Sequence, residues 1–181
     1  MTSMGEGNRS KLSLQKAKAS SVEIIVETPK GSRNKYKYDP DNDVFKLSKV
    51  LPEGMVFPYD FGFVPSTKAA DGDPLDVLML MDEATFPGCL VECRLIGVIK
   101  AEQEEQGKTH RNDRLIAVAT QSITYADVKH LRDLNATVLK QIEAFFINYQ
   151  AVRGVKSKVL GHEGPQSAMR ILEGSAQTKA A

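Results

Sequence analysis

Residues 71–80 read Asp-Gly-Asp-Pro-Leu-Asp-Val-Leu-Met-Leu, a sharp turn that leads straight into an apolar run. Gly72 and Pro74 are residues that form turns. The run from Leu75 to Met81 is apolar except for Asp76, and an apolar run of this length is typical of a buried β-strand. The sequence therefore predicts that the chain turns at 71–74 and enters a sheet directly afterwards.

Similar short strands are predicted on both sides of this turn. The alternation of apolar and polar residues, bounded by Gly, Pro, Asn and Asp, predicts strands at 22–27, 34–38, 44–47, 75–81, 90–101, 115–120 and 156–160. The turn-rich segment 39–43 joins the second and third strands into a hairpin. The segment from Leu51 to Lys68 is predicted to be a loop, because several Pro and Gly residues interrupt it.

Helical patterns occur only late in the chain. The spacing predicts a short helix over 124–134 and a longer one over 136–152, with a possible helix at 166–173. The longer one has Asn135 as its cap and an apolar stripe formed by Val138, Ile142, Phe145, Phe146 and Tyr149. Strands and helices do not alternate along the chain, which argues against a Rossmann fold. The fold class is therefore α+β, mainly β: a closed or highly curved sheet with two or three helices packed on it.

Length and charge exclude several classes of protein. At 181 residues the chain fits one domain, which we place at 21–175, with a flexible polar tail at 1–20 and a short tail at 176–181. The 24 basic and 23 acidic side chains nearly cancel, which argues against a nucleic-acid binder. No apolar stretch approaches the ~20 residues that span a bilayer.

The cysteine content favours a reducing compartment. Cys89 and Cys93 lie in a strand-like run, where four residues of extended chain span ~13 Å. That separation is too long for a disulfide. We therefore expect a cytoplasmic protein with no membrane partner.

The densest group of carboxylates in a structured context is Asp71, Asp73 and Asp76. A solvated surface turn is the simplest explanation of Asp-Gly-Asp alone. Asp76, however, lies inside an apolar strand, where an unpaired charge would be costly. An EF-hand fits poorly, since Pro74 and Leu75 interrupt its series of oxygen ligands. A metal-dependent phosphoryl-transfer site remains, with Mg²⁺ as the favoured ion and Mn²⁺ or Co²⁺ as alternatives.

Such a site also needs donors for phosphate. Lys35 and Lys37 lie two residues apart on a strand and so point to the same face. Lys49, Arg114 and the phenol of Tyr149 are further candidates. Each has an ordinary structural explanation, as a solvated cation or, for Tyr149, as part of a helix core.

The order of these motifs resembles the soluble family I inorganic pyrophosphatases. The resemblance extends from about Val22 to Gly161 and is most specific at DGDPLDVLML (71–80) with GFVPST (62–67) just before it. It implies a small closed OB-like β-barrel and Mg²⁺-dependent hydrolysis of pyrophosphate to two orthophosphates. It also implies a homo-oligomer.

The resemblance assigns roles to single residues. It implies metal-binding carboxylates at Asp71, Asp73 and Asp76, with Asp73 also accepting a proton from the attacking water. Glu27 falls on an acidic position that supports the metal through water. Lys35 matches a phosphate-binding, catalytic lysine, and Tyr149 matches a phosphate-binding tyrosine; Lys49 and Arg114 complete the expected phosphate shell.

Several positions depart from the family pattern. Lys37 stands where the family usually has Glu, Lys49 replaces Arg, and Phe57 and Phe61 replace two tyrosines. Gln103 aligns with a metal-binding Asp, with Glu102 or Glu104 as possible substitutes, and Gln150 stands where a Lys is common. The usual Asp-x-Lys reads Asn112-Asp113-Arg114, and we expect Asp113 to take over the metal-binding role through a shift of one residue.

Two functions are compatible with this pattern. The first is an active but divergent pyrophosphatase. The alternative is a catalytically weakened regulatory protein on the same fold that binds pyrophosphate or a nucleotide, because fold alone does not establish function. The three aspartates favour the enzyme, since a site that only binds anions gains nothing from carboxylates without a metal.

Overall fold

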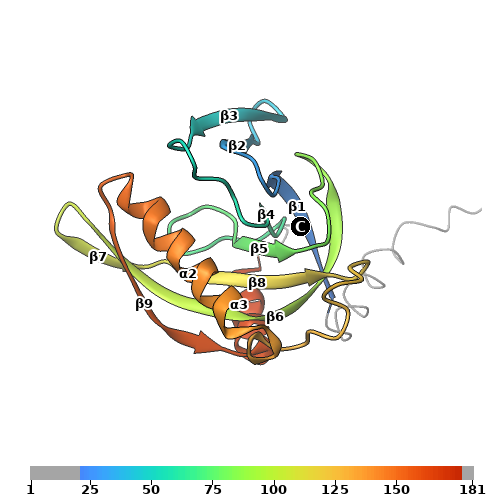
Figure 1. The fold of residues 1–181 in the computed structure, drawn as a ribbon. Coiled ribbons are helices and arrows are strands. Elements are labelled where there is room, and N and C mark those ends of the chain that lie inside the picture. Colours follow the sequence, from blue (N-terminus) through green and yellow to red (C-terminus); the bar gives the residue numbers. More distant parts are fainter. Residues whose placement is uncertain (1–20, 177–181) are drawn as a thin grey trace, which may run out of the picture.

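The computed structural model describes residues 21–176, and its main feature is a seven-stranded sheet that closes into a ring (Figure 1). Around the ring follow β1 (Ser21–Thr28), β4 (Asp60–Phe63), β5 (Asp76–Leu80), β8 (Arg114–Ala119) and β6 (Leu90–Glu105), and β6 pairs again with β1. β7 (Lys108–Arg111) and β9 (Lys156–Glu163) pair with β6. The pairs are antiparallel except β5–β8. The predicted closed, mainly β sheet is confirmed.

Strands β4, β5 and β8 of the ring are buried on both faces. In β5, Val77 and Met79 belong to one apolar cluster, and Leu78 and Leu80 belong to another. This alternation explains why the strand reads as a continuous apolar run. Helix α3 (Pro165–Ser175) packs against the first cluster and helix α2 (Ala136–Ala151) against the second, so each helix covers a different cluster of the sheet core.

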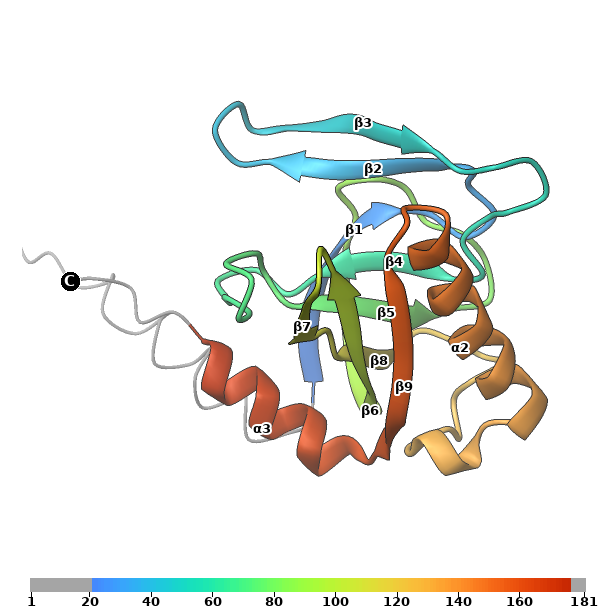
Figure 2. The same cartoon turned by 90° about the vertical axis from the view of Figure 1, so that its left-hand side faces the viewer.

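A separate hairpin completes the fold. Strands β2 (Asn34–Asp39) and β3 (Val44–Val50) form their own two-stranded sheet, which lies apart from the ring, beyond β1 and β4 (Figure 2). Beside it, β1 and β4 pair so closely that a side chain at Gly62 would collide with the carbonyl of Ile25.

Three segments differ from the sequence-based predictions. The predicted loop 51–68 contains β4, and the charged connection after residue 101 contains β7. The predicted helix at 124–134 is wrong: only the 3₁₀ turn η1 (Leu131–Asp133) forms there. The guanidinium of Arg94 donates to the carbonyls of Tyr125, Ala126 and Val128, and the carbonyl of Tyr125 also accepts from the backbone N–H of Val128 in a turn.

The predicted tail at 1–20 lies outside the described residues, as does the predicted tail at 176–181 except for Ala176, which forms an isolated bridge with Thr67. Within the described part, no helix has both the length and the apolar character that crossing a bilayer requires. Cys89 and Cys93 are both free thiols, in agreement with the prediction that they do not pair.

Candidate active site

A cavity of about 800 Å³ lies between the β2–β3 hairpin, the turn at 71–76 and the C-terminal end of α2. Nine of the candidate residues line it together: Glu27, Lys35, Lys37, Lys49, Asp71, Asp73, Asp76, Arg114 and Tyr149. They come from β1, β2, β3, the 71–76 turn and β5, β8 and α2. The predicted shared face of Lys35 and Lys37 is therefore confirmed.

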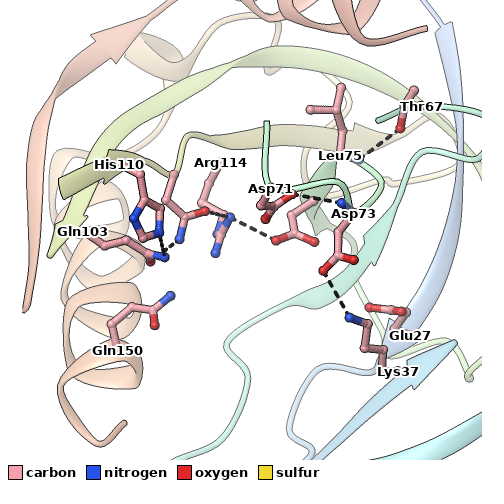
Figure 3. A network of polar contacts seen from close by, with 12 residues as sticks. Glu27, Lys37, Thr67, Asp71, Asp73, Leu75, Gln103, His110, Arg114 and Gln150 are labelled. Carbon is pink, nitrogen blue, oxygen red and sulfur yellow. Dashed lines mark hydrogen bonds and ion pairs between the residues drawn. The ribbon is translucent and has the colours of Figure 1, made fainter. Parts of the chain in front are cut away.

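The three aspartates make different contacts at the cavity (Figure 3). The carboxylate of Asp71 accepts a hydrogen bond of 3.0 Å from the backbone N–H of Asp73. The carboxylate of Asp73 points toward the hairpin, where it lies 3.1 Å from the ammonium of Lys37. Asp76, at the start of β5, lies 2.9 Å from a guanidinium nitrogen of Arg114. Two of the three carboxylates are therefore paired with cations.

A row of amides continues from Arg114 along the cavity wall (Figure 3). The guanidinium of Arg114 also donates to the amide oxygen of Asn112, and the amide nitrogen of Asn112 donates to Gln103. The amide nitrogen of Gln103 lies 2.7 Å from the imidazole Nε2 of His110. Where the family pattern has carboxylates, this wall carries neutral side chains that bind one another.

Asp113 does not join the cavity. Its carboxylate accepts from the backbone N–H of Ala101 at 3.1 Å and pairs with Arg111 at 2.8 Å. Asn112 lines the cavity instead. The expected shift of one residue is not seen: Asn112 and Asp113 precede β8, and Asp113 borders a smaller pocket that Asp71 and Asp76 also line, while its carboxylate stays bound to Arg111.

Side chains alternate between the two faces of β6, and this alternation decides which of them face the cavity. Gln103 lines the cavity, whereas neither Glu102 nor Glu104 does. The neighbours of Gln103 point to the opposite face of the strand. The two glutamates are therefore not substitutes for the missing carboxylate.

Glu27 and Lys35 form a buried pair at the base of the cavity. The ammonium of Lys35 lies 3.7 Å from the Glu27 carboxylate, which also accepts from the backbone N–H of Tyr38. The ammonium also lies 4.2 Å from the ring centre of Phe61 and 5.5 Å from that of Phe57. Burial raises the pKa of Glu27 and lowers the pKa of Lys35, and in each case it outweighs the attraction between them.

Phe57 and Phe61 contact Lys35 through their rings. Their aromatic faces attract the Lys35 ammonium by cation–π interaction. The lysine is therefore fixed by two rings and one carboxylate. Its ammonium faces a cavity that can hold an anion.

The far side of the cavity is formed by Tyr149 and two further cations. The ammonium of Lys49 lies 5.4 Å from the ring centre of Tyr149, and repulsion from Arg153 adds to burial in lowering the pKa of Lys49. Burial raises the pKa of the Tyr149 phenol, so the hydroxyl stays protonated at neutral pH and can donate a hydrogen bond.

The sequence did not predict that Arg153 and Gln150 line the cavity. Arg153 follows Tyr149 by four residues, which places both on one side of the helix end, and this spacing was the available signal. Gln150 also lines the cavity and accepts a hydrogen bond of 3.0 Å from Arg153.

The donor chemistry suits a hard divalent cation. Asp71, Asp73 and Asp76 supply only carboxylate oxygens, which Mg²⁺ prefers. Within residues 21–176, however, no three His, Cys, Asp or Glu side chains are already gathered closely enough to hold a metal ion. One of the three carboxylates, that of Asp73, is engaged by Lys37 in a half-exposed ion pair, and such exposed pairs contribute only ~0.2–1 kcal/mol.

Comparison with known proteins gives a consistent result. The sequence model of the family described as inorganic pyrophosphatase matches residues 24–180. A relative from Halalkalibacterium halodurans named inorganic pyrophosphatase is 37% identical over 155 residues, which cover 84% of this chain and 91% of the relative. One from Thermus thermophilus with the same name is 39% identical over 152 residues, covering 84% and 85%.

Solved structures agree with these matches. The crystal structure of an inorganic pyrophosphatase from Thermus thermophilus is similar with a TM-score of 0.80 and 32% identity, covering 96% of this chain and 94% of that one. The structure of the enzyme from Helicobacter pylori has a TM-score of 0.80 and 34% identity, with coverage of 87% and 92%.

Proposed function

The chain belongs to the inorganic pyrophosphatase family, and we propose that it hydrolyses pyrophosphate to two orthophosphates in the cavity between the hairpin and α2. One observation carries the assignment to this cavity. The aspartates of the 71–76 turn and the cations expected to bind phosphate line the same space, although they are far apart in the sequence.

We assign the metal ions of the reaction to the aspartate side of the cavity. Asp71, Asp73 and Asp76 would hold Mg²⁺, with Mn²⁺ or Co²⁺ as alternatives, and Glu27 would support the site through water. When bound, such an ion lowers the pKa of a water molecule and offsets the charge of the phosphates. Asp113 is left out of this set, because its carboxylate pairs with Arg111.

The protein residues then divide the remaining work. Asp73 accepts the proton of the attacking water as the P–O–P bridge breaks. It suits this role because it is the most accessible member of the turn's ion pairs, with 59% of its side chain exposed. Lys35, held by Phe57 and Phe61, binds the phosphate at the base of the cavity. Lys49, Arg114 and the protonated hydroxyl of Tyr149 bind the phosphates from the other side.

The family match and the aspartates favour this function over the regulatory alternative. The relatives are named as enzymes. A protein that only bound anions would also have no use for three carboxylates beside its cations, since they repel phosphate.

Two further expectations belong to the proposal. A cytoplasmic location is supported by the two free thiols. Assembly into a homo-oligomer stays a prediction.

Orthophosphate release from pyrophosphate tests the proposed function directly. Purified protein should release two orthophosphates per pyrophosphate with Mg²⁺ and none above background with a chelator. Absence of release with Mg²⁺, Mn²⁺ and Co²⁺ alike would reject the enzyme and favour the binding protein.

A further inference from the structure

We propose that Lys37 is an internal competitor for the metal: its ammonium contacts the carboxylate of Asp73 and has to leave before a divalent ion can bind there. The proposal rests on the proposed function, because it concerns the metal site assigned above. Its consequence is that the protein without substrate binds divalent ions weakly at Asp73.

The contact that carries this inference joins the hairpin to the turn. Lys37 on β2 and Asp73 in the turn are 36 residues apart in sequence, and their charged atoms lie 3.1 Å apart at the cavity (Figure 3). A divalent ion bound to this oxygen would lie in the space that the ammonium fills. The two cations therefore exclude each other.

The charge of the cavity supports the same conclusion. Among the described residues its lining contains the carboxylates of Glu27, Asp71, Asp73 and Asp76 and the cations of Lys35, Lys37, Lys49, Arg114 and Arg153. In their ordinary ionised forms these groups sum to a positive charge. Sites that collect divalent ions depend on an excess of carboxylates, because only negative charge offsets the loss of the ion's hydration.

Comparison of the two ion pairs shows which one yields to a metal. Arg114 and Asp76 are mostly buried, with 13% and 33% of their side chains exposed, and the guanidinium is also held by Asn112. Lys37 and Asp73 are 49% and 59% exposed. Exposed pairs are weak and their members rearrange easily. Lys37 is thus the exchangeable cation, and Arg114 is a fixed part of the wall.

Metal binding in the absence of substrate tests this role. The fraction of free Mn²⁺ is measured by electron paramagnetic resonance as MnCl₂ is added to wild type and to Lys37→Gln. The variant should bind Mn²⁺ about fivefold more tightly, since it removes a competing charge whose contact is of the strength of an exposed ion pair. Lys37→Glu should bind more tightly still, because it adds a carboxylate oxygen.

Two comparisons make the test specific. Lys140→Gln makes the same change of charge at an exposed position of α2 outside the cavity lining, and its Mn²⁺ affinity should equal that of wild type. In an Asp73→Asn background, Lys37→Gln should change the affinity by less than about twofold, because the contact that it removes is already broken. Melting temperatures check that each variant is folded.

The outcomes separate this inference from the proposed function. Unchanged or weaker Mn²⁺ binding by Lys37→Gln would overturn the inference, as would an equal gain in Lys140→Gln or a full gain in the Asp73→Asn background. Any of these can occur while the wild type still hydrolyses pyrophosphate. Conversely, Lys37→Gln could bind Mn²⁺ more tightly while the wild type releases no orthophosphate. That combination would reject the enzyme and retain Lys37 as the competitor.

Discussion

Tyr149→Phe separates the catalytic contribution of this side chain from its structural one. The residue is 9% exposed, and its ring packs against Phe57 and Phe145, each with centroids 5.8 Å away. Within the described residues its hydroxyl makes no hydrogen bond to another side chain or to the backbone, and it lines the cavity. Removal of the hydroxyl keeps the ring packing, so stability should change by less than about 0.5 kcal/mol.

The expected loss in catalysis is much larger. A hydrogen bond to a charged group contributes ~1.5–3 kcal/mol. If the hydroxyl donates to a phosphate in the transition state, its loss should lower kcat/KM by about 10- to 150-fold. The phenol is protonated at neutral pH because burial raises its pKa, so the variant loses a donor and no charge.

The assay is the initial rate of orthophosphate release near neutral pH, combined with thermal unfolding of the same samples. Tyr125→Phe is the matched control: its hydroxyl lies 3.1 Å from that of Tyr59, and neither residue lines the cavity. That variant should lose about 1 kcal/mol of stability and keep its kcat/KM. The reasoning is refuted if Tyr149→Phe keeps kcat/KM within about threefold of wild type while its melting temperature falls.

Three further predictions concern the surroundings of the site. Asp113→Ala should leave the Mg²⁺ dependence of the rate unchanged, because its carboxylate binds Arg111; a loss of tenfold or more in a Mg²⁺ titration would place Asp113 among the metal ligands. Hydrogen bonds from Lys46 lower the pKa of Asp39 to about 2, against about 4 in an unfolded chain, so the ionised form stabilises the protein above pH ~4 and this contribution is lost as the pH falls through 2. Acid titration followed by circular dichroism should show that Asp39→Asn lacks this component, and an unchanged titration would contradict it. Burial raises the pKa of Cys93 to about 12, so Ellman's reagent should label it only after unfolding, even at mildly alkaline pH; labelling of the folded protein would show that the strand opens.

Most of the sheet could be predicted from the sequence, because its strands are short apolar runs with clear punctuation. The 75–81 prediction corresponds to β5 within a residue at each end, and the stripe on 136–152 corresponds to α2. β4 was missed, since Asp60–Phe63 is only four residues long and stands among prolines. Its place in the sheet depends on contacts with β1 and β5, which local sequence does not contain.

The prediction of a helix at 124–134 was wrong for a related reason. Its apolar spacing is real, and Tyr125 and Val128 do pack against the core. Three carbonyls of this segment accept from the guanidinium of Arg94, about 30 residues earlier in the chain. A pattern within one segment cannot reveal such a distant hydrogen-bonding partner.

The site was predictable as a set of residues but not as a set of contacts. Nine candidate side chains line one cavity, eight of them implied by the resemblance and the ninth, Lys37, indicated by its spacing from Lys35. Which carboxylate meets which cation depends on how the hairpin lies over the turn, as in the contact between Lys37 and Asp73. The position of Asp113 likewise depends on its contacts with the backbone N–H of Ala101 and with Arg111.

The turnover of Asp73→Asn at saturating Mg²⁺ tests most directly the claim that this cavity carries out the reaction. The amide keeps the size of the side chain but cannot accept the proton of the attacking water, and it binds a hard cation more weakly. Loss of a positioned general base typically costs 10²–10⁴-fold in rate, so kcat should fall by at least about 100-fold while the melting temperature stays near that of wild type. A folded variant with a kcat within about threefold of wild type would contradict the account, because the turn at 71–76 would then lie outside the chemistry.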